Sequence, residues 1–156
     1  MDLPFIDEFK VDVRAPRDLV FLEVAGRMGR SFEGPVPRWF SGLLRCVDRG
    51  TSYTVPPSAG QEANGFRVAR VDAPSTLVLE GQHRFATYRL SFFVDALNEG
   101  CCRVRARTDA AFPGLKGAIY RALVIGSGGH RIVVRQLLAG IARRAERDAG
   151  RAPSLL

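Results

Sequence analysis

Two consecutive stretches, residues 83–94 and 101–110, alternate between apolar and polar side chains along their length. Asn98, Glu99 and Gly100 separate them, and this combination of residues is typical of a tight turn. Alternation with a period of two indicates β-strands that bury one face and expose the other. The two stretches therefore predict an antiparallel hairpin whose apolar face must be covered by another part of the chain. That face carries Ala86, Tyr88, Leu90, Phe92 and Val94 on the first strand, and Cys102, Val104, Ala106, Thr108 and Ala110 on the second.

The first part of the chain predicts one strand and two short helices. The strand covers Phe5–Val13, where charged residues alternate with apolar ones. The first helix starts around Pro16, because proline lacks only an N–H that has no intrahelical partner in the first turn. This helix is expected to reach Gly26 and Gly29. The second helix is predicted over Arg38–Val47, where apolar residues recur at spacings of three and four.

The middle of the chain predicts shorter strands. Phe66–Val71 and Thr76–Gly81 are expected to pair through a turn that contains a proline. Ser52–Val55 predicts a weak strand that ends before two prolines, and Ser58–Asn64 predicts a loop of small and polar residues.

The end of the chain is predicted to be helical. Apolar residues repeat at helical spacing from Leu115 to Ala145, with an interruption or kink at Gly126–Gly129. A strand, two short helices, a run of antiparallel strands and a long final helix form an α+β order. The sheet is expected to curve around the last helix. We predict a single domain over residues 1–150 and a C-terminal tail over residues 151–156.

The composition is that of an ordinary globular protein, with 46% hydrophobic and 25% charged residues, which excludes wholesale disorder. No apolar run reaches the roughly 18 residues that a membrane span needs. The first residues are acidic, whereas a secretion signal starts with a basic segment. We therefore expect a cytoplasmic protein. Cys46, Cys101 and Cys102 lack the spacing of a zinc site or a disulfide framework, so we expect no metal and no cofactor.

Several segments match motifs of a known fold. Val11–Asp18 resembles a strand-to-helix motif of the form v-x-v-x-A-P-x-x, and the predicted second helix carries Trp39 and Phe40. With the order of elements, these segments resemble the START-like superfamily (SRPBCC), which includes Bet v 1-like and polyketide cyclase/dehydratase-like proteins. The resemblance implies a helix-grip fold, in which a curved antiparallel sheet wraps around a long C-terminal helix and two short helices follow strand 1.

The second half of the chain resembles a bacterial branch of this superfamily more closely. No activity is attached to that branch, so the resemblance implies a fold and not a chemistry. Members of the superfamily bind lipids, sterols, hormones or polyketides between the sheet and the final helix, and some are cyclases or aromatases. The segments that carry this closer resemblance are Gly81–Phe85, Tyr88–Ser91, Thr108–Tyr120 and His130–Val134.

The net charge of +7 makes an anionic partner one interpretation, whether a metabolite, a membrane surface or a nucleic acid. Arg103, Arg105 and Arg107 form a row on the polar face of one strand. The helix-grip fold implied by the resemblance places the first strand beside this one, so Glu8, Lys10 and Asp12 are expected to lie opposite the row. Cross-strand ion pairs would then absorb much of its charge, which argues against a nucleic-acid partner.

The leading hypothesis is that the protein binds a small hydrophobic or amphipathic ligand, lipid- or polyketide-like, in a cavity between the sheet and the C-terminal helix. An excess of inward aromatic residues and a glycine-interrupted helix favour this hypothesis. The alternative is that the same side chains fill the core. The sequence leaves open a monomer or a homodimer. The residues predicted to line the cavity are Trp39, Phe40, Leu77, Leu79, Tyr88, Phe92, Tyr120 and Leu137.

The sequence contains no GxSxG, HExxH or P-loop motif, so a non-catalytic binding protein is the favoured interpretation. The alternative is a cyclase- or dehydratase-like enzyme, and the candidate catalytic residues are Asp7 and His130, with Tyr88 as a further polar group. A third hypothesis is a basic protein associated with anions or nucleic acid.

Asp7 is unusual because the alternation places it on the inward face with Phe5 and Phe9. A carboxylate in that position needs a partner or water. Glu23 and Arg121 are the partners that the sequence offers. The alternative interpretation places Asp7 at the frayed edge of the sheet.

Overall fold

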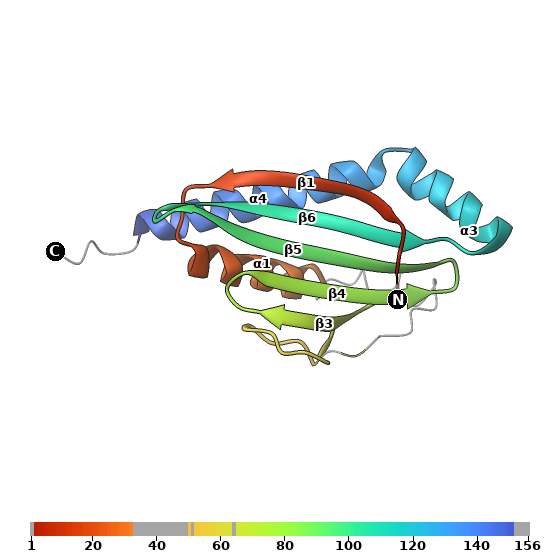
Figure 1. Cartoon of the computed structure of the whole chain (residues 1–156), viewed down its shortest axis with the longest axis horizontal. Helices are drawn as coiled ribbons and strands as arrows, with labels where there is room; N and C mark the ends of the chain where they lie inside the picture. Colours follow the sequence, from red (N-terminus) through yellow and green to blue (C-terminus); the bar gives the residue numbers. More distant parts are fainter. Residues whose placement is uncertain (1, 33–49, 51, 64, 152–156) are drawn as a thin grey trace.

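The antiparallel sheet expected from the alternating residues forms one layer of the molecule (Figure 1). The computed structural model describes residues 2–32, 50, 52–63 and 65–151. Within them, the strand order is β1-β6-β5-β4-β3-β2, and every pair of neighbours is antiparallel. The elements are β1 (Phe5–Val13), α1 (Arg17–Phe32), β2 (Glu62–Ala63), β3 (Phe66–Asp72), β4 (Thr76–His83), β5 (Ala86–Asn98), β6 (Cys101–Ala111), α3 (Gly114–Arg121), the π-helical segment η1 (Ala122–Gly126) and α4 (Gly129–Arg151).

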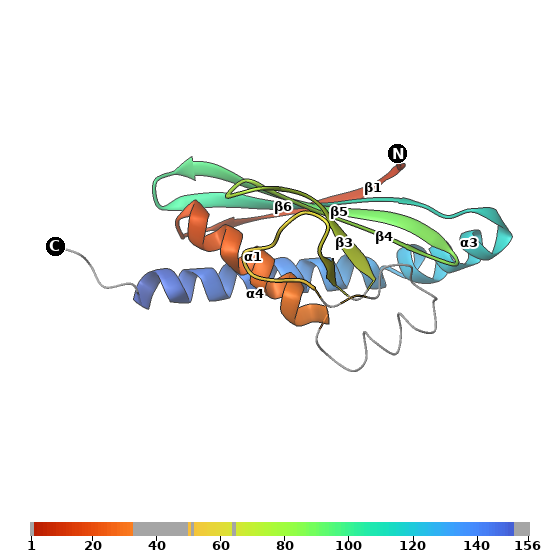
Figure 2. The same ribbon diagram turned by 90° about the horizontal axis from the view of Figure 1, so that it is seen from below.

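Helices α1 and α4 lie on the same face of the sheet, and α4 runs along its length (Figure 2). The core forms where the apolar faces of the central strands meet these two helices. Leu77, Leu79 and Phe92 have no exposed surface, and Val134 and Leu138 of α4 belong to the same buried cluster. This arrangement confirms the predicted α+β fold with a curved antiparallel sheet and a long C-terminal helix. No helix in the described part of the chain is long and apolar enough to cross a bilayer.

The pairing of β1 with β6 contains an irregularity that changes the predicted faces of β1. Phe5 pairs with Asp109, but Asp7 pairs with Thr108, so the register shifts between Phe5 and Asp7. The prediction that Phe5 shares the inward face of Asp7 is therefore wrong, because a bulge breaks the alternation. Phe5 is 57% exposed, and the guanidinium of Arg107 lies 5.2 Å from the centre of its ring.

Several predicted boundaries also differ from the structure. Helix α1 continues past Gly26 and Gly29 to Phe32, because burial of its apolar face outweighs the cost of glycine inside a helix, about 1 kcal/mol each. No strand forms over the described residues 52–55, and part of the predicted loop 58–64 forms β2. The second helix predicted over Arg38–Val47 lies outside the described residues, as does the tail at 152–156.

His83 ends β4, and β5 begins only at Ala86. The prediction of one strand over residues 83–94 was therefore wrong at its start, because a two-residue turn at Arg84 and Phe85 reverses the chain there. The two residues of this turn are neither glycine nor proline, so the local sequence does not mark the position of the turn.

The predicted interruption near Gly126–Gly129 is present in the structure. The helical segment α3 passes into the π-helical turns of η1, and α4 starts at Gly129 after a turn in which Gly128 has a φ of 78°. Positive φ is favourable only for glycine, which explains the residue type at this turn. Helix α3 projects beyond the end of the sheet (Figures 1 and 2).

Candidate functional site

The structure brings the two predicted catalytic candidates, Asp7 and His130, together. Asp7 is inward on the edge strand β1, and the neighbouring inward residue on β6 is Thr108. His130 lies in the first turn of α4, with its Nε2 atom 3.4 Å from Asp7 Oδ1 and 3.1 Å from Thr108 Oγ1. We call these three residues the polar cluster.

The partner of Asp7 is therefore His130, and neither residue that the sequence suggested takes this role. Glu23 pairs with Arg30 at 3.5 Å and with Arg144 at 3.4 Å. Arg121 is exposed on α3. Asp7 lies on the first strand and His130 on the last helix, so no local sequence spacing could predict this pair.

Asp7 Oδ1 is buried and has no hydrogen-bond partner among the residues that the structure describes. His130 Nε2 lies at ion-pair distance from this oxygen rather than in hydrogen-bond geometry. An unsatisfied buried oxygen of this kind costs roughly 1–3 kcal/mol relative to a bonded one. The polar cluster can thus accept one further hydrogen bond from a donor placed between the sheet and α4.

The polar cluster differs from a hydrolase-type relay. In such a relay the carboxylate bonds one imidazole nitrogen and the hydroxyl bonds the other. Here both Asp7 and Thr108 approach Nε2, the same nitrogen of His130. One nitrogen carries either one proton or one lone pair, so it cannot fully satisfy both oxygens. The arrangement favours holding a polar group over activating the threonine hydroxyl.

The polar cluster forms one end of a row of inward residues that crosses the sheet. The strand registers place Asp7 opposite Thr108, Thr108 opposite Leu90, and Leu90 opposite Leu79. Val68 on β3 completes the row. The inner face therefore has a polar end at the β1 edge and an apolar remainder, which is the pattern that an amphipathic molecule requires.

Thr108 was not predicted as a site residue, although the sequence contains a signal. It is the one polar side chain among the five inward residues of the strand over 101–110. A hydroxyl in that position needs a partner when it is buried. His130 provides that partner in the structure.

The residues predicted to line a cavity fall into three groups. Leu77, Leu79 and Phe92 are fully buried in the core cluster. Tyr88, Tyr120 and Leu137 are only partly buried, and so is Leu90 beside Thr108. Trp39 and Phe40 lie outside the described residues.

An aromatic group surrounds His83 at the turn between β4 and β5. The ring of His83 lies 5.0 Å from that of Tyr120 and 5.4 Å from that of Tyr88, and Phe85 stacks on Tyr120 at 5.7 Å. His83 Nδ1 accepts a hydrogen bond from the backbone N–H of Phe85. Burial lowers the pKa of His83. These contacts give His83 a structural role.

The hydroxyl of Tyr88 is also engaged away from the polar cluster. It donates a hydrogen bond of 2.6 Å to the carbonyl of Gly65, which precedes β3. The prediction that Tyr88 could act together with Asp7 and His130 therefore finds no support in this hydrogen bond.

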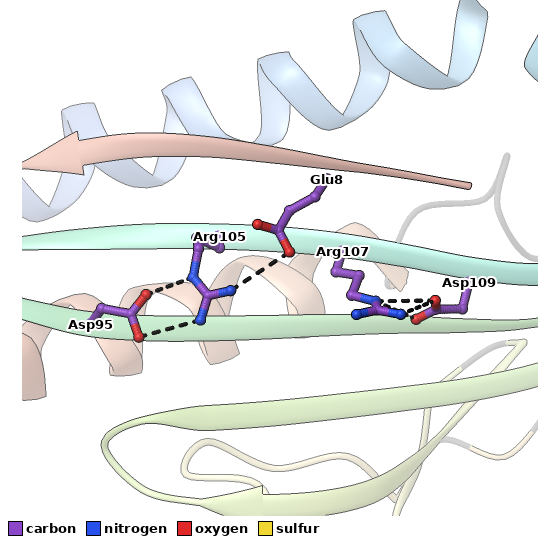
Figure 3. Close-up of polar contacts among 5 residues, drawn as sticks. All are labelled: Glu8, Asp95, Arg105, Arg107 and Asp109. Carbon is purple, nitrogen blue, oxygen red and sulfur yellow. Dashed lines mark hydrogen bonds and ion pairs between the residues drawn. The ribbon is translucent and has the colours of Figure 1, made fainter. Parts of the chain in front are cut away.

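The outer face of the sheet carries the predicted row of paired arginines (Figure 3). Arg105 binds Asp95 at 2.6 Å and Glu8 at 3.6 Å, and the hydrogen bond to Asp95 raises the pKa of Arg105. Arg107 makes two-nitrogen contacts with Asp109. The prediction of cross-strand pairing is confirmed for Arg105, whereas Arg107 binds a carboxylate of its own strand. This face presents alternating charges rather than a continuous cationic surface.

Arg103 completes this row by binding Asp12 across the strand pair at 2.6 Å, as predicted. Among the described residues, no group of three or more His, Cys, Asp or Glu side chains could hold a metal ion. Cys101 and Cys102 are free thiols there, and burial raises the pKa of Cys102 to about 11.

The comparisons with known proteins find similarity in the fold but none in the sequence. The sequence matches no protein-family model and no curated protein. The structure is similar to the Zhui aromatase/cyclase from a Streptomyces species, with a TM-score of 0.59, 15% identity, and coverage of 99% of this chain and 100% of that one. It is also similar to a START superfamily protein from Mycobacterium smegmatis, with a TM-score of 0.54, 13% identity, and coverage of 90% and 98%.

A third similar structure is a norcoclaurine synthase point mutant from Thalictrum flavum, with a TM-score of 0.53, 11% identity, and coverage of 94% of this chain and 99% of that one. At these identities, shared architecture is what the likeness shows. The chain has the START-like, helix-grip fold.

Proposed function

We propose that the protein binds a small amphipathic molecule between the sheet and α4, and that the polar cluster holds its polar group. The buried Oδ1 of Asp7, which has no hydrogen bond among the described residues, is the observation that carries this proposal. A hydroxyl or amine of the ligand would donate a hydrogen bond to this oxygen. The Thr108 hydroxyl and the His130 imidazole lie within reach of the same group.

The apolar part of the ligand would extend from the polar cluster over inward residues that are only partly buried. Leu90 lies next to Thr108 in the register, and Tyr88 is two residues away on the same face of β5. Leu137 is partly buried on α4. Leu77 and Phe92, which have no exposed surface, would support this surface from the core. The ligand class is a lipid- or polyketide-like molecule with at least one hydrogen-bond donor.

Native mass spectrometry of the purified protein tests whether a small molecule is retained. Titration with a fluorescent hydroxylated flavonoid tests binding directly. A fluorescent fatty acid is the second probe, with a long apolar chain and a polar group that differs from that of the flavonoid. We expect Asp7→Asn to weaken flavonoid binding about 10- to 100-fold, since a hydrogen bond to a charged group contributes roughly 1.5–3 kcal/mol. Asp12→Asn on the outer face is the matched control and should leave binding unchanged.

If neither probe binds and no molecule is retained, the proposal fails. If both probes bind but Asp7→Asn binds the flavonoid as tightly as the native protein does, the polar cluster is not the anchor.

A cyclase-like enzyme is the second candidate function, because one observation favours it. The adjacent carboxylate and imidazole could move a proton at a bound carbonyl compound. Two of the similar structures are an aromatase/cyclase and a synthase by their descriptions. Turnover of a polyketide-like substrate that is lost in folded His130→Ala, with binding retained, would establish this function over passive binding. A basic protein for nucleic acid has less support, because the outer-face arginines are paired.

A further inference from the structure

Helix α3 turns a stripe of large apolar side chains toward solvent. Leu115 is 79% exposed, Ile119 is 55% exposed, and Leu123 in the following segment η1 is 68% exposed. The opposite side of α3 is already occupied. Gly117 is buried against the backbone of residues 85 and 112, and Tyr120 stacks on Phe85. The contacts of α3 with the sheet therefore leave this stripe uncovered.

Helical geometry places basic side chains beside the stripe. At about 100° per residue, Leu115 and Ile119 lie about 40° apart on the helix circumference. Lys116 lies on one flank of that sector, about 60° beyond Ile119, whereas Arg121 lies about 40° from Gly117 on the far side; both are exposed. The inner residues Gly117 and Tyr120 fall on the far side by the same rotation. The exposed face of α3 is thus apolar along its centre and cationic at the margin that carries Lys116.

The charge around this segment has a single sign. Residues 110–145 contain no aspartate or glutamate, but they contain Lys116, Arg121, Arg131, Arg135, Arg143 and Arg144. Lys116, Arg121 and Arg131 form no ion pair within the described part of the chain. The arginines on the outer face of the sheet, in contrast, are bound to carboxylates. The segment that carries the apolar stripe therefore contains positively charged side chains and no negatively charged ones.

We propose that α3 and η1 form a docking face for a lipid bilayer that contains anionic headgroups. Exposed leucine and isoleucine side chains would enter the boundary between headgroups and acyl chains, and the flanking Lys116 would lie among the phosphates. The segment projects past the end of the sheet, so a flat surface can approach it without meeting the strands (Figures 1 and 2). This proposal does not depend on the polar cluster or on ligand binding.

Co-sedimentation with vesicles tests the proposal on the full chain. One set of vesicles contains phosphatidylcholine alone, and the other contains equal parts of phosphatidylcholine and phosphatidylglycerol. We expect about tenfold or more tighter binding to the anionic vesicles, with a steep loss at high salt, because the attraction of cations to the surface is screened. Equal or absent binding to the two sets overturns the proposal.

Two sets of variants separate the apolar and cationic contributions. Leu115→Ser combined with Ile119→Ser and Leu123→Ser removes the stripe, and Leu97→Ser at the β5–β6 turn is the control for an exposed leucine elsewhere. Lys116→Gln removes the flanking charge, with Arg143→Gln near the far end of α4 as its control. We expect both sets to lose vesicle binding and both controls to keep it. Since all substituted side chains are exposed, circular dichroism should show unchanged folding.

Light scattering tests the competing explanation, which is that the apolar stripe joins two copies of the chain. If the native protein is a dimer in solution, the stripe variant is a monomer, and both bind vesicles equally, then the face joins two copies of the chain and the proposal is wrong. A monomer whose vesicle binding depends on the stripe supports it. Flavonoid binding by the stripe variant should match that of the native protein, so failure of the docking face can be told apart from failure of the proposed ligand site.

Discussion

Asp7 on the first strand and His130 on the last helix approach to 3.4 Å on the inner face of the sheet. Their contact joins the edge strand β1 to the first turn of α4, directly after the glycine-containing turn that separates α4 from η1. The carboxylate gains an ion-pair neighbour but no hydrogen bond at Oδ1. Asp7 is therefore expected to contribute little to stability, and a measured small contribution would favour the proposed binding role over a structural one.

Asp7→Asn is therefore expected to leave the free energy of unfolding unchanged or raise it by up to about 1 kcal/mol at pH 8, because the variant buries no charge. Urea denaturation followed by circular dichroism measures this change. Asp109→Asn is the control, since the Asp109 carboxylate is buried and is bonded to Arg107, and this variant should destabilise the protein. A large loss of stability in Asp7→Asn would assign Asp7 a structural role instead.

Leu79 and Leu90 allow the packed and the ligand-facing parts of the inner surface to be compared. They are direct cross-strand neighbours, but Leu79 is fully buried whereas Leu90 is only partly buried. We expect Leu79→Ala to lower the free energy of unfolding by about 3 kcal/mol, within the usual range for a packed leucine. Leu90→Ala should lower it by about 1 kcal/mol in the ligand-free protein and should weaken flavonoid binding. Equal losses in denaturation experiments would mean that both residues are simply core.

Much of the sheet could be predicted from the sequence because each of its strands has one solvent-exposed face and one buried face. Alternation over residues 101–110 identified β6 and its inward residues, and the same pattern identified β1. The ion pairs Arg103–Asp12 and Arg105–Glu8 followed from that alternation once β1 and β6 were taken as neighbours. Period-two patterns specify faces well, since a one-residue slip would expose every apolar side chain.

Features that depend on long-range contacts could not be predicted in this way. The bulge beside Phe5 carries no glycine or proline, so the local sequence did not indicate that Phe5 would lie on the opposite face of the sheet from Asp7. The polar cluster joins residues from three elements, and only the register and the helix position bring them together. The turn after His83 was missed for a related reason, because its aromatic contacts with Tyr88 and Tyr120 stabilise a tight connection that local residue types do not indicate.

His83 makes the stability depend on pH below neutrality. Burial lowers its pKa in the folded state from the ordinary value of 6.5, so the unfolded chain binds a proton that the folded chain excludes. Stability is therefore expected to fall as the pH decreases below about 6.5 and to continue falling until the folded-state pKa is reached. His83→Phe retains a ring for the contacts with Tyr88 and Tyr120 and should flatten this part of the profile. Denaturant titrations of both proteins between pH 7.5 and about 5 measure the difference; parallel profiles would show that His83 is not responsible.

Gly81 is required by the close approach of two backbones. A Cβ at this position would collide with the carbonyl oxygen of Gly65 and with the ring of Tyr88, which itself donates a hydrogen bond to that carbonyl. Gly81→Ala must therefore displace backbone rather than a flexible side chain, and we expect it to cost at least about 2 kcal/mol of stability. Gly100→Ala, at the open β5–β6 turn where a Cβ meets no neighbour, should change stability by less than about 0.5 kcal/mol. Thermal unfolding of the two variants provides the measurement, and similar melting temperatures would refute the close approach of Gly65 to β4.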